Sequence, residues 1–165
     1  MSESYVECMV ARRTPGVQLF FKYLLVGLTV VCALGGLTVM PILLIGAIAC
    51  GVGAYFVTMY TDLEFEYLYL DKEITVDKVM HKTKRKRVAT YAVEKIEILA
   101  PIKSYHLDGY KNRQCKELDF SSGVSELPDR RYVFFYDGKE KIIFEPNAEL
   151  VKMVKNVAPR KVFTD

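Results

Sequence analysis

The sequence lacks charge over one long internal stretch. Between Lys22 and Asp62 lie 39 consecutive residues without an acidic or basic side chain. A single straight helix of that length would measure roughly 58 Å, whereas the hydrocarbon core of a bilayer is about 30 Å thick. The run therefore excludes one simple membrane span and predicts two spans joined by a tight turn.

Recognisable catalytic and nucleic-acid-binding patterns are also missing. The sequence has no phosphate-binding Gly-rich loop, no nucleophile elbow, no zinc-protease motif and no zinc-finger or helix-turn-helix pattern. Ser104, His106 and Asp108 fall within five residues, but triad partners come from separate elements, so His106 is expected to be a surface histidine. We therefore predict a non-enzymatic protein with no catalytic residue, no metal, no cofactor and no nucleic-acid partner.

Paired cysteines are absent as well. Cys8, Cys32, Cys50 and Cys115 follow neither a disulfide framework nor a metal-ligand spacing. Two of them lie inside the uncharged run. This favours free thiols in a reducing compartment, with acylation of Cys8 beside the membrane as the alternative.

The uncharged run divides into predicted spans at residues 17–36 and 40–60. Gly35 and Gly36 mark the turn, and Pro41 suits the first turn of the second helix. Basic residues flank the outer ends of the run, whereas the turn carries no charge. Both termini are therefore predicted to be cytoplasmic, in a multi-pass protein of the cell membrane.

Small residues in the second span provide a face for close helix packing. They are Gly46, Ala47, Cys50 and Gly51. We expect them to pack onto the first span, and homo-oligomerisation within the membrane is the alternative. The core of neither span holds an acidic residue, a histidine or an arginine, which argues against a proton or ion pathway.

Residues 1–16 are predicted to be a cytoplasmic or interfacial segment. Tyr5, Val6, Met9 and Val10 are spaced for one helical face. The segment is either a frayed terminus or a short helix on the membrane surface. Acidic residues precede the apolar run and the run is too long, so a signal peptide is not expected.

From Asp62 the hydrophobic pattern has a period of two, which is typical of β-strands. Strands are predicted at residues 63–70, 74–80, 87–93, 96–100, 131–136 and 140–144, and around Leu118. Asp137-Gly138 separates the last two strands and is the pair that a type I′ hairpin turn favours. Asp62, Glu64 and Glu66 are expected to face solvent, with weak metal contact as the alternative, and the aromatic residues at 132–136 to form wall and core.

The fold class that these patterns predict is α+β. A two-helix transmembrane hairpin at residues 17–61 is followed by a small antiparallel β-barrel at 62–158. An amphipathic helix at 147–157 is expected to cap one open end of the barrel, because its apolar side chains share a face. Residues 159–165 form a tail.

The candidate site is a basic loop at residues 81–86 with its flanks. Its cations are Lys78, Lys82, Lys84, Arg85, Lys86 and Arg87. Such a cluster near a bilayer is attracted to anionic lipid by about 1 kcal/mol per residue, falling away within a Debye length. The alternative is a solvated turn between two strands.

The segments ITVDKVM, KTKRKR and RVATYAVEKIEIL, with the late hairpin and the terminal helix, resemble bacterial pleckstrin-homology-like (PH-like) domains attached to membrane hairpins. The whole chain is similar to a Gram-positive membrane-protein family of unknown function with this layout. Eukaryotic members bind headgroups at the first hairpin loop. Here that loop is Asp71-Lys72-Glu73, which is net acidic, so phosphoinositide recognition is not implied.

The resemblance implies a binding or scaffolding domain displayed at the cytoplasmic face of the lipid bilayer. The implied partners are anionic lipid at the basic loop and a membrane or cytoplasmic protein docked at an exposed strand edge or at the barrel rim. The alternative is an accessory subunit of a membrane transporter or of an envelope enzyme complex.

Overall fold

A computed structural model describes residues 5–165 of the chain. These residues form two compact units. One consists of Thr14–Leu63 together with Met80–Lys84 and contains two long helices. The other comprises the described residues before Thr14, Glu64–Val79 and Arg85–Asp165, and contains two β-sheets and a short helix.

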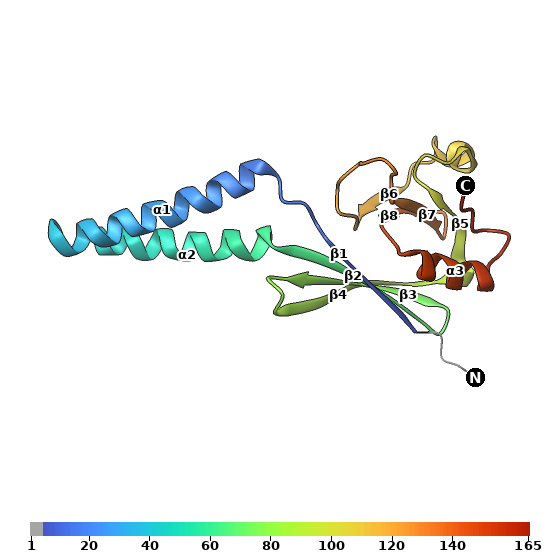
Figure 1. Ribbon diagram of the computed structural model, residues 1–165, viewed down its shortest axis with the longest axis horizontal. Helices are drawn as coiled ribbons and strands as arrows, with labels where there is room; N and C mark the ends of the chain where they lie inside the picture. The colour runs from blue at the N-terminus through green and yellow to red at the C-terminus, as the bar shows by residue number, and fades with distance from the viewer. Residues whose placement is uncertain (1–4) are drawn as a thin grey trace. The chain divides into compact units, whose positions relative to one another are not determined.

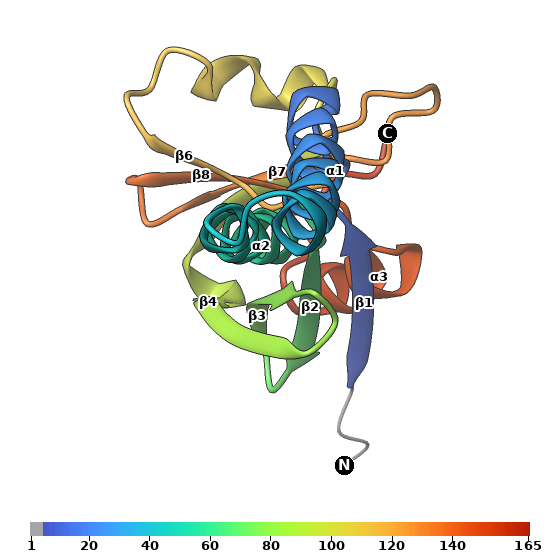
Figure 2. The same ribbon diagram turned by 90° about the vertical axis from the view of Figure 1, so that its left-hand side faces the viewer.

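The long helices α1 (Gly16–Thr38) and α2 (Leu43–Thr61) lie side by side and antiparallel, joined by a short turn (Figures 1 and 2). Both are long and apolar enough to cross a membrane, with mean hydropathies of 2.0 and 1.8. The hydroxyls of Thr29, Thr38 and Thr61 donate to carbonyl oxygens four residues earlier, which satisfies these polar groups within each helix. The predicted two-helix hairpin is confirmed.

Small side chains of α2 lie against α1. A Cβ atom placed on Gly46 would lie 3.9 Å from Cys32 Sγ, and one on Gly51 would lie 3.5 Å from Thr29 Cγ2. Ala47 is buried and Cys50 is half-buried on the same helix. Close backbone approach of this kind depends on residues without bulky side chains.

The tightest approach in the hairpin is at Gly36, near its turn. A Cβ atom on Gly36 would lie 2.8 Å from the side chain of Leu44 and 2.9 Å from its backbone nitrogen. No real Cβ atom tolerates such a contact with backbone, so the packing of α1 against α2 requires glycine at this position.

Sheet 1 has the strand order β1 (Val6–Ala11), β2 (Leu63–Leu70), β3 (Glu73–Met80) and β4 (Lys84–Ala92). Both predicted alternatives for the N-terminal segment, a frayed terminus and a short surface helix, are wrong over Val6–Ala11, because β1 pairs antiparallel with β2, Val6 opposite Tyr69. The segment also fits a period of two, because the apolar residues Val6, Cys8 and Val10 alternate with Glu7 and Met9. Residues 1–4 of the predicted segment lie outside the described residues.

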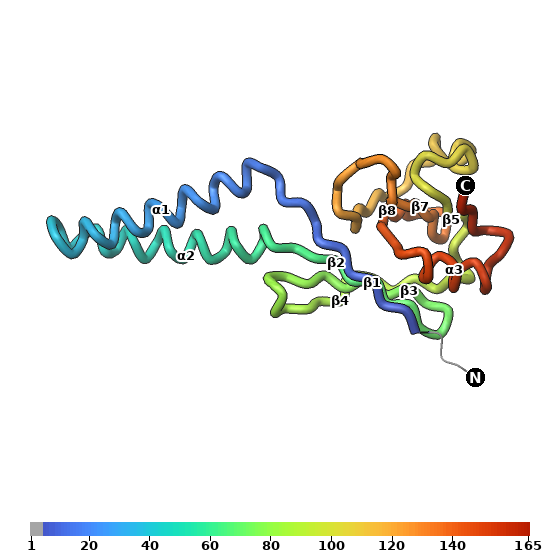
Figure 3. Tube along the Cα trace, in the orientation of Figure 1, coloured from blue at the N-terminus to red at the C-terminus, as the bar shows by residue number. Residues whose placement is uncertain are grey.

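Sheet 2 has the strand order β5 (Ile96–Pro101), β7 (Tyr132–Tyr136), β8 (Glu140–Phe144) and β6 (Lys116–Asp119). Asp137 and Gly138 both have positive φ, 51° and 66°, as the predicted type I′ turn requires. The long connection from β6 to β7 can be followed in Figure 3. β6 pairs with β8 in parallel, which departs from the predicted all-antiparallel arrangement.

The core of this unit lies between the sheets and is rich in aromatic rings. The centroids of Tyr67 and Phe144 are 5.5 Å apart and those of Tyr91 and Phe134 are 5.2 Å apart, both in edge-on geometry. Helix α3 (Ala148–Val157) begins after Asn147, whose side chain accepts the Leu150 N–H at 2.8 Å. Its buried residues are Leu150, Val151 and Val154.

The α+β class is confirmed, but closure of the strands into a barrel is wrong. Over the described part of the chain, no strand of sheet 1 is paired with a strand of sheet 2. Between β4 and β5 the chain forms a 3₁₀ turn, η1 (Val93–Lys95), where a continuous strand would be needed to bridge the sheets. The result is two separate four-stranded sheets.

Candidate functional site

The predicted basic loop is shorter than expected, and most of its cations lie on a strand. β3 ends at Met80, and β4 already begins at Lys84. His81 and Lys82 occupy the central positions of the turn, with φ of 49° and 55°. Two such residues give the primed turn whose twist matches a β-hairpin. We call residues 80–84 the basic turn.

The basic turn is hydrogen-bonded to the end of the helical hairpin, and both belong to one compact unit. The His81 N–H donates to the Asp62 carbonyl at 2.8 Å, and His81 Nδ1 lies 3.4 Å from Asp62 Oδ2. Asp62 is the residue that ends α2. Lys22, near the start of α1, places its Nζ 3.6 Å from the other oxygen of the same carboxylate. The basic turn therefore lies where α1 begins and α2 ends.

The cations of the segment divide into two groups. Arg85 Nη2 lies 2.9 Å from Glu66 Oε1, and Arg87 Nε lies 3.6 Å from Asp77 Oδ1. Within residues 5–165 the remaining four have no ion-pair partner: they are Lys78, Lys82, Lys84 and Lys86. Their positive charge is available to an external anion.

Glu66 is buried, contrary to the expectation that it faces solvent. Its exposure is 2%, and its Oε2 has no donor among the described residues. Burial, followed by a hydrogen bond with Glu7, raises the pKa of Glu66 to about 7, while Arg85 opposes the shift. The same bond lowers the pKa of Glu7. Glu66 therefore keeps its proton up to about pH 7, whereas Glu7 ionises more readily than usual.

The sequence contained no signal for this pair. A period-two pattern places Glu64 and Glu66 on the polar face of β2, and such a face is usually solvated. The burial of Glu66 arises from β1 and β4, which come from either side of β2 in the chain and contribute Glu7 and Arg85. Only the pairing of β1 with β2, which was not predicted, could have indicated it.

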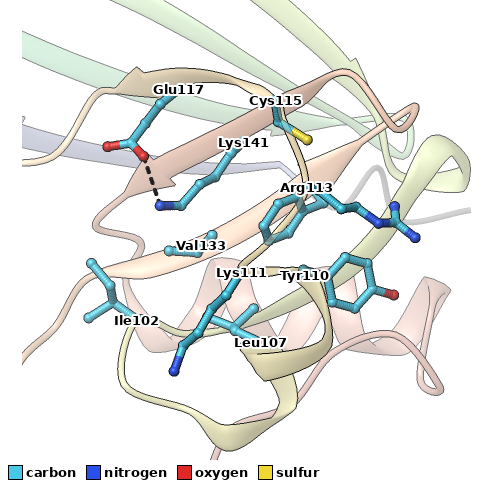
Figure 4. Close-up of a pocket in the computed structure, with 10 residues that line it drawn as sticks. Ile102, Leu107, Tyr110, Lys111, Arg113, Cys115, Glu117, Val133 and Lys141 are labelled. Atoms are coloured by element: carbon cyan, nitrogen blue, oxygen red, sulfur yellow. Dashed lines mark hydrogen bonds and ion pairs between the residues drawn. The ribbon is translucent and has the colours of Figure 1, made fainter.

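A cavity of about 210 Å³ lies on one face of sheet 2 (Figure 4). Its lining includes the apolar residues Val133 and Phe135 and the cations Lys111, Arg113 and Lys141. Each of these cations is already matched within the domain, since their charged atoms lie within ion-pair distance of Asp108, Glu97 and Glu117 respectively. The cavity thus has a mixed apolar and charged lining, and its cations are compensated within the domain.

The structure brings Ser104 and His106 together with Asp165, not with Asp108. The Ser104 hydroxyl donates to Asp165 Oδ2 at 2.5 Å, and His106 Nε2 lies 3.9 Å from Asp165 Oδ1. Asp108 instead pairs with Lys111. Because Ser104 donates to a carboxylate and not to the histidine, the group lacks the bond between nucleophile and base that a triad requires.

A metal centre is not indicated by the side chains that the structure describes. Over residues 5–165 no three His, Cys, Asp or Glu side chains gather in a metal-binding group. Asp62 is engaged with Lys22 and His81, and Glu66 with Arg85.

Comparison with known protein families gives one match, described as a bacterial PH-like domain (DUF6106), over residues 2–164. No curated protein and no solved structure matches the chain. The family match spans the two apolar helices as well as both sheets. This chain therefore belongs to the bacterial PH-like domain family DUF6106.

Proposed function

We propose that this chain is a non-enzymatic, membrane-anchored binding module. In this account α1 and α2 cross the cell membrane, both termini are cytoplasmic, and the basic turn contacts anionic lipid. The observation that carries the proposal is the attachment of the basic turn, through His81 and Asp62, to the end of the helical hairpin. If α1 and α2 span a bilayer, that end lies at the interface, and so do the free ammonium groups of Lys82 and Lys84.

The sidedness follows from the distribution of charge. Arg12, Arg13 and Lys22 flank the start of α1, and the turn between the helices has no charge. Basic flanks are retained in the cytoplasm, so only residues 39–42 would reach the other side. The inner leaflet is rich in anionic lipid, which places the basic turn opposite a negatively charged surface.

The strength of the contact can be bounded. A lysine close to an anionic surface gains about 1 kcal/mol, and the gain disappears beyond about 10 Å at 0.1 M salt. If α1 and α2 span the bilayer, Lys82 and Lys84 lie close to its surface, because the basic turn is held at the end of the hairpin. Each should be occupied by lipid phosphate for most of the time when anionic lipid is present.

Lysine acylation of the full chain in nanodiscs tests this proposal. Nanodiscs of phosphatidylcholine alone are compared with nanodiscs that also contain phosphatidylglycerol. We expect Lys82 and Lys84 to react roughly fivefold more slowly in the anionic discs, because about 1 kcal/mol of attraction corresponds to that factor. Exposed Lys152 on α3 is the internal control.

High salt should restore the reactivity of Lys82 and Lys84, since the attraction is electrostatic. Equal acylation of both lysines in the two kinds of nanodisc would overturn the lipid contact. Slower acylation of Lys152 to the same extent would show a general effect of the lipid and would count against it as well.

A further inference from the structure

Sheet 2 carries apolar side chains on both of its faces. Phe134 of β7 belongs to the aromatic core between the sheets. Because side chains alternate between the faces of a strand, Val133 and Phe135 lie on the opposite face, and they are also buried, with exposures of 1% and 3%. The 3₁₀ helix η2 (Tyr105–Tyr110) covers them and adds buried Leu107 to the same apolar cluster. The cavity of Figure 4 is lined by both β7 and η2, within one compact unit.

The apolar part of the cavity suits an aromatic ring. Tyr110 and Phe135 line it as a pair of rings whose centroids are 4.9 Å apart, and Ile102 and Leu107 add aliphatic surface. Aromatic rings pack favourably against one another in offset or edge-on geometry. The volume of about 210 Å³ exceeds the roughly 150 Å³ of an apolar cavity that holds benzene. A ligand with one six-membered ring therefore fits, and a much larger one does not.

The charged side chains of the lining have a net positive charge. They are Lys111, Arg113, Lys141 and Glu117. Glu117 pairs with Lys141 at 2.8 Å. Lys111 and Arg113 instead pair with Asp108 and Glu97, which do not line the cavity. The electrostatic complement of this lining is an anionic group.

Lys111 is the cation that can most readily bind such a group. Its side chain is 70% exposed and that of its partner Asp108 is 61% exposed, and an ion pair so exposed contributes little to stability. Arg113 is held more firmly, because it lies 2.7 Å from Glu97 and over the ring of Tyr110. Lys111 can therefore exchange Asp108 for the carboxylate of a ligand at little cost.

The positions of the lysines agree with this assignment. In Figure 4 the side chains of Lys111 and Lys141 extend to the same side of the cavity as Ile102, whereas Arg113 extends to the other side. Lys141 is already engaged with Glu117. One lysine is thus left for one negative charge, which matches a monocarboxylate better than a group with two negative charges.

We propose that this cavity binds a small aryl monocarboxylate, with its ring against Tyr110 and Phe135 and its carboxylate at Lys111. The proposal goes beyond the lipid contact and does not depend on it. Lys82 and Lys84 belong to the compact unit of the helical hairpin, whereas the residues that line the cavity belong to the other unit. The two proposals can therefore fail separately.

The test measures binding of 4-fluorophenylacetate to the full chain in phosphatidylcholine nanodiscs. Broadening of the fluorine NMR signal reports binding, and empty nanodiscs are the blank. The amide 4-fluorophenylacetamide has the same ring without the charge and should bind about fivefold more weakly. Trifluoroacetate has the charge without the ring and should not broaden.

Two variants place the ligand in the cavity. Lys111→Gln should weaken binding of the acid about fivefold and leave binding of the amide unchanged. Lys116→Gln is the matched control, because Lys116 is an exposed lysine nearby in the chain that does not line the cavity. Cys115→Leu adds bulk to the lining and should weaken binding of both ligands about tenfold. If Cys115→Leu does not fold, the comparison of the three ligands on the wild type carries the test.

The proposal is overturned if the wild type does not broaden the signal of 4-fluorophenylacetate beyond the blank. Equal binding of the acid and the amide would overturn it as well, since the cavity would then not recognise the charge. Equal weakening by Lys111→Gln and Lys116→Gln would show that the acid responds to the overall charge of the domain, and this result also contradicts the assigned site.

Discussion

Glu66 and Glu7 are neighbouring carboxyl groups whose pKa values shift in opposite directions. Arg85 pairs with Glu66, and Asp77 adds a further negative charge near Glu66. The Tyr5 hydroxyl donates to the Glu7 carboxylate at 2.7 Å. With both glutamates ionised, Arg85 would have to compensate two carboxylates, since Arg87 already lies 3.6 Å from Asp77. Protonation of Glu66 relieves this repulsion, so burial of Glu66 destabilises the fold least while its carboxyl group is neutral.

The pair predicts that stability falls as pH rises. The folded-state pKa of Glu66, about 7, lies above its ordinary value of 4.5. The contribution of protonated Glu66 to the free energy of unfolding is therefore fully present below about pH 4.5 and is lost as the pH rises through 7. Between these values the wild type should lose roughly 2 kcal/mol of unfolding free energy relative to Glu66→Gln, which keeps the shape and cannot ionise.

Thermal and denaturant unfolding of the full chain in neutral detergent across this pH range measures the effect. Glu64→Gln is the matched control, because Glu64 lies on the same strand and shows no such burial. Parallel stability profiles for wild type and Glu66→Gln would contradict the raised pKa of Glu66.

At the scale of secondary-structure elements, the β3–β4 hairpin carries the proposed lipid contact. The basic turn precedes β4 directly in the chain, with Lys84 belonging to both. The run of cations suggested a loop, because charged residues have low strand propensity. Pairing with β3 through a two-residue turn overrides that propensity, and no local signal in the sequence could show that the partner strand extends so far.

The hairpin of α1 and α2 was predictable in outline because its signal is long and unambiguous. The uncharged run is too long for one span, and Pro41 lies in the turn. The prediction that Gly35 and Gly36 mark the turn is wrong, because both lie in α1, which ends at Thr38. β1 was not predictable, since six residues with mixed spacing fit a helix and a strand equally. Its partner β2 follows more than fifty residues later in the chain.

Substitution of Gly36 tests the packing of this hairpin. Gly36→Ala places a methyl group against the backbone of Leu44 and should destabilise the helix pair by about 1–3 kcal/mol. Gly27→Ala is the control, because nothing lies within 4 Å of a Cβ atom there and alanine favours a helix. Unfolding by dodecyl sulfate in mixed micelles compares them, and equal stabilities would refute the packing.

At the scale of the whole molecule, one family match covers the apolar helices and both sheets. The helices and both sheets therefore fall within the same family match. Strand positions were predictable from alternation, but the division into two sheets was not. It depends on pairings between segments far apart in the chain, such as β6 with β8, which periodicity does not encode.

The orientation of α1 and α2 in a membrane is the claim on which the lipid contact depends. Alkaline phosphatase, which is active only outside the cytoplasm, and a fluorescent protein are each fused after Val39 and after Asp165. The account predicts phosphatase activity only for the fusion after Val39, and fluorescence without phosphatase activity for the fusion after Asp165. Phosphatase activity after Asp165 would contradict it.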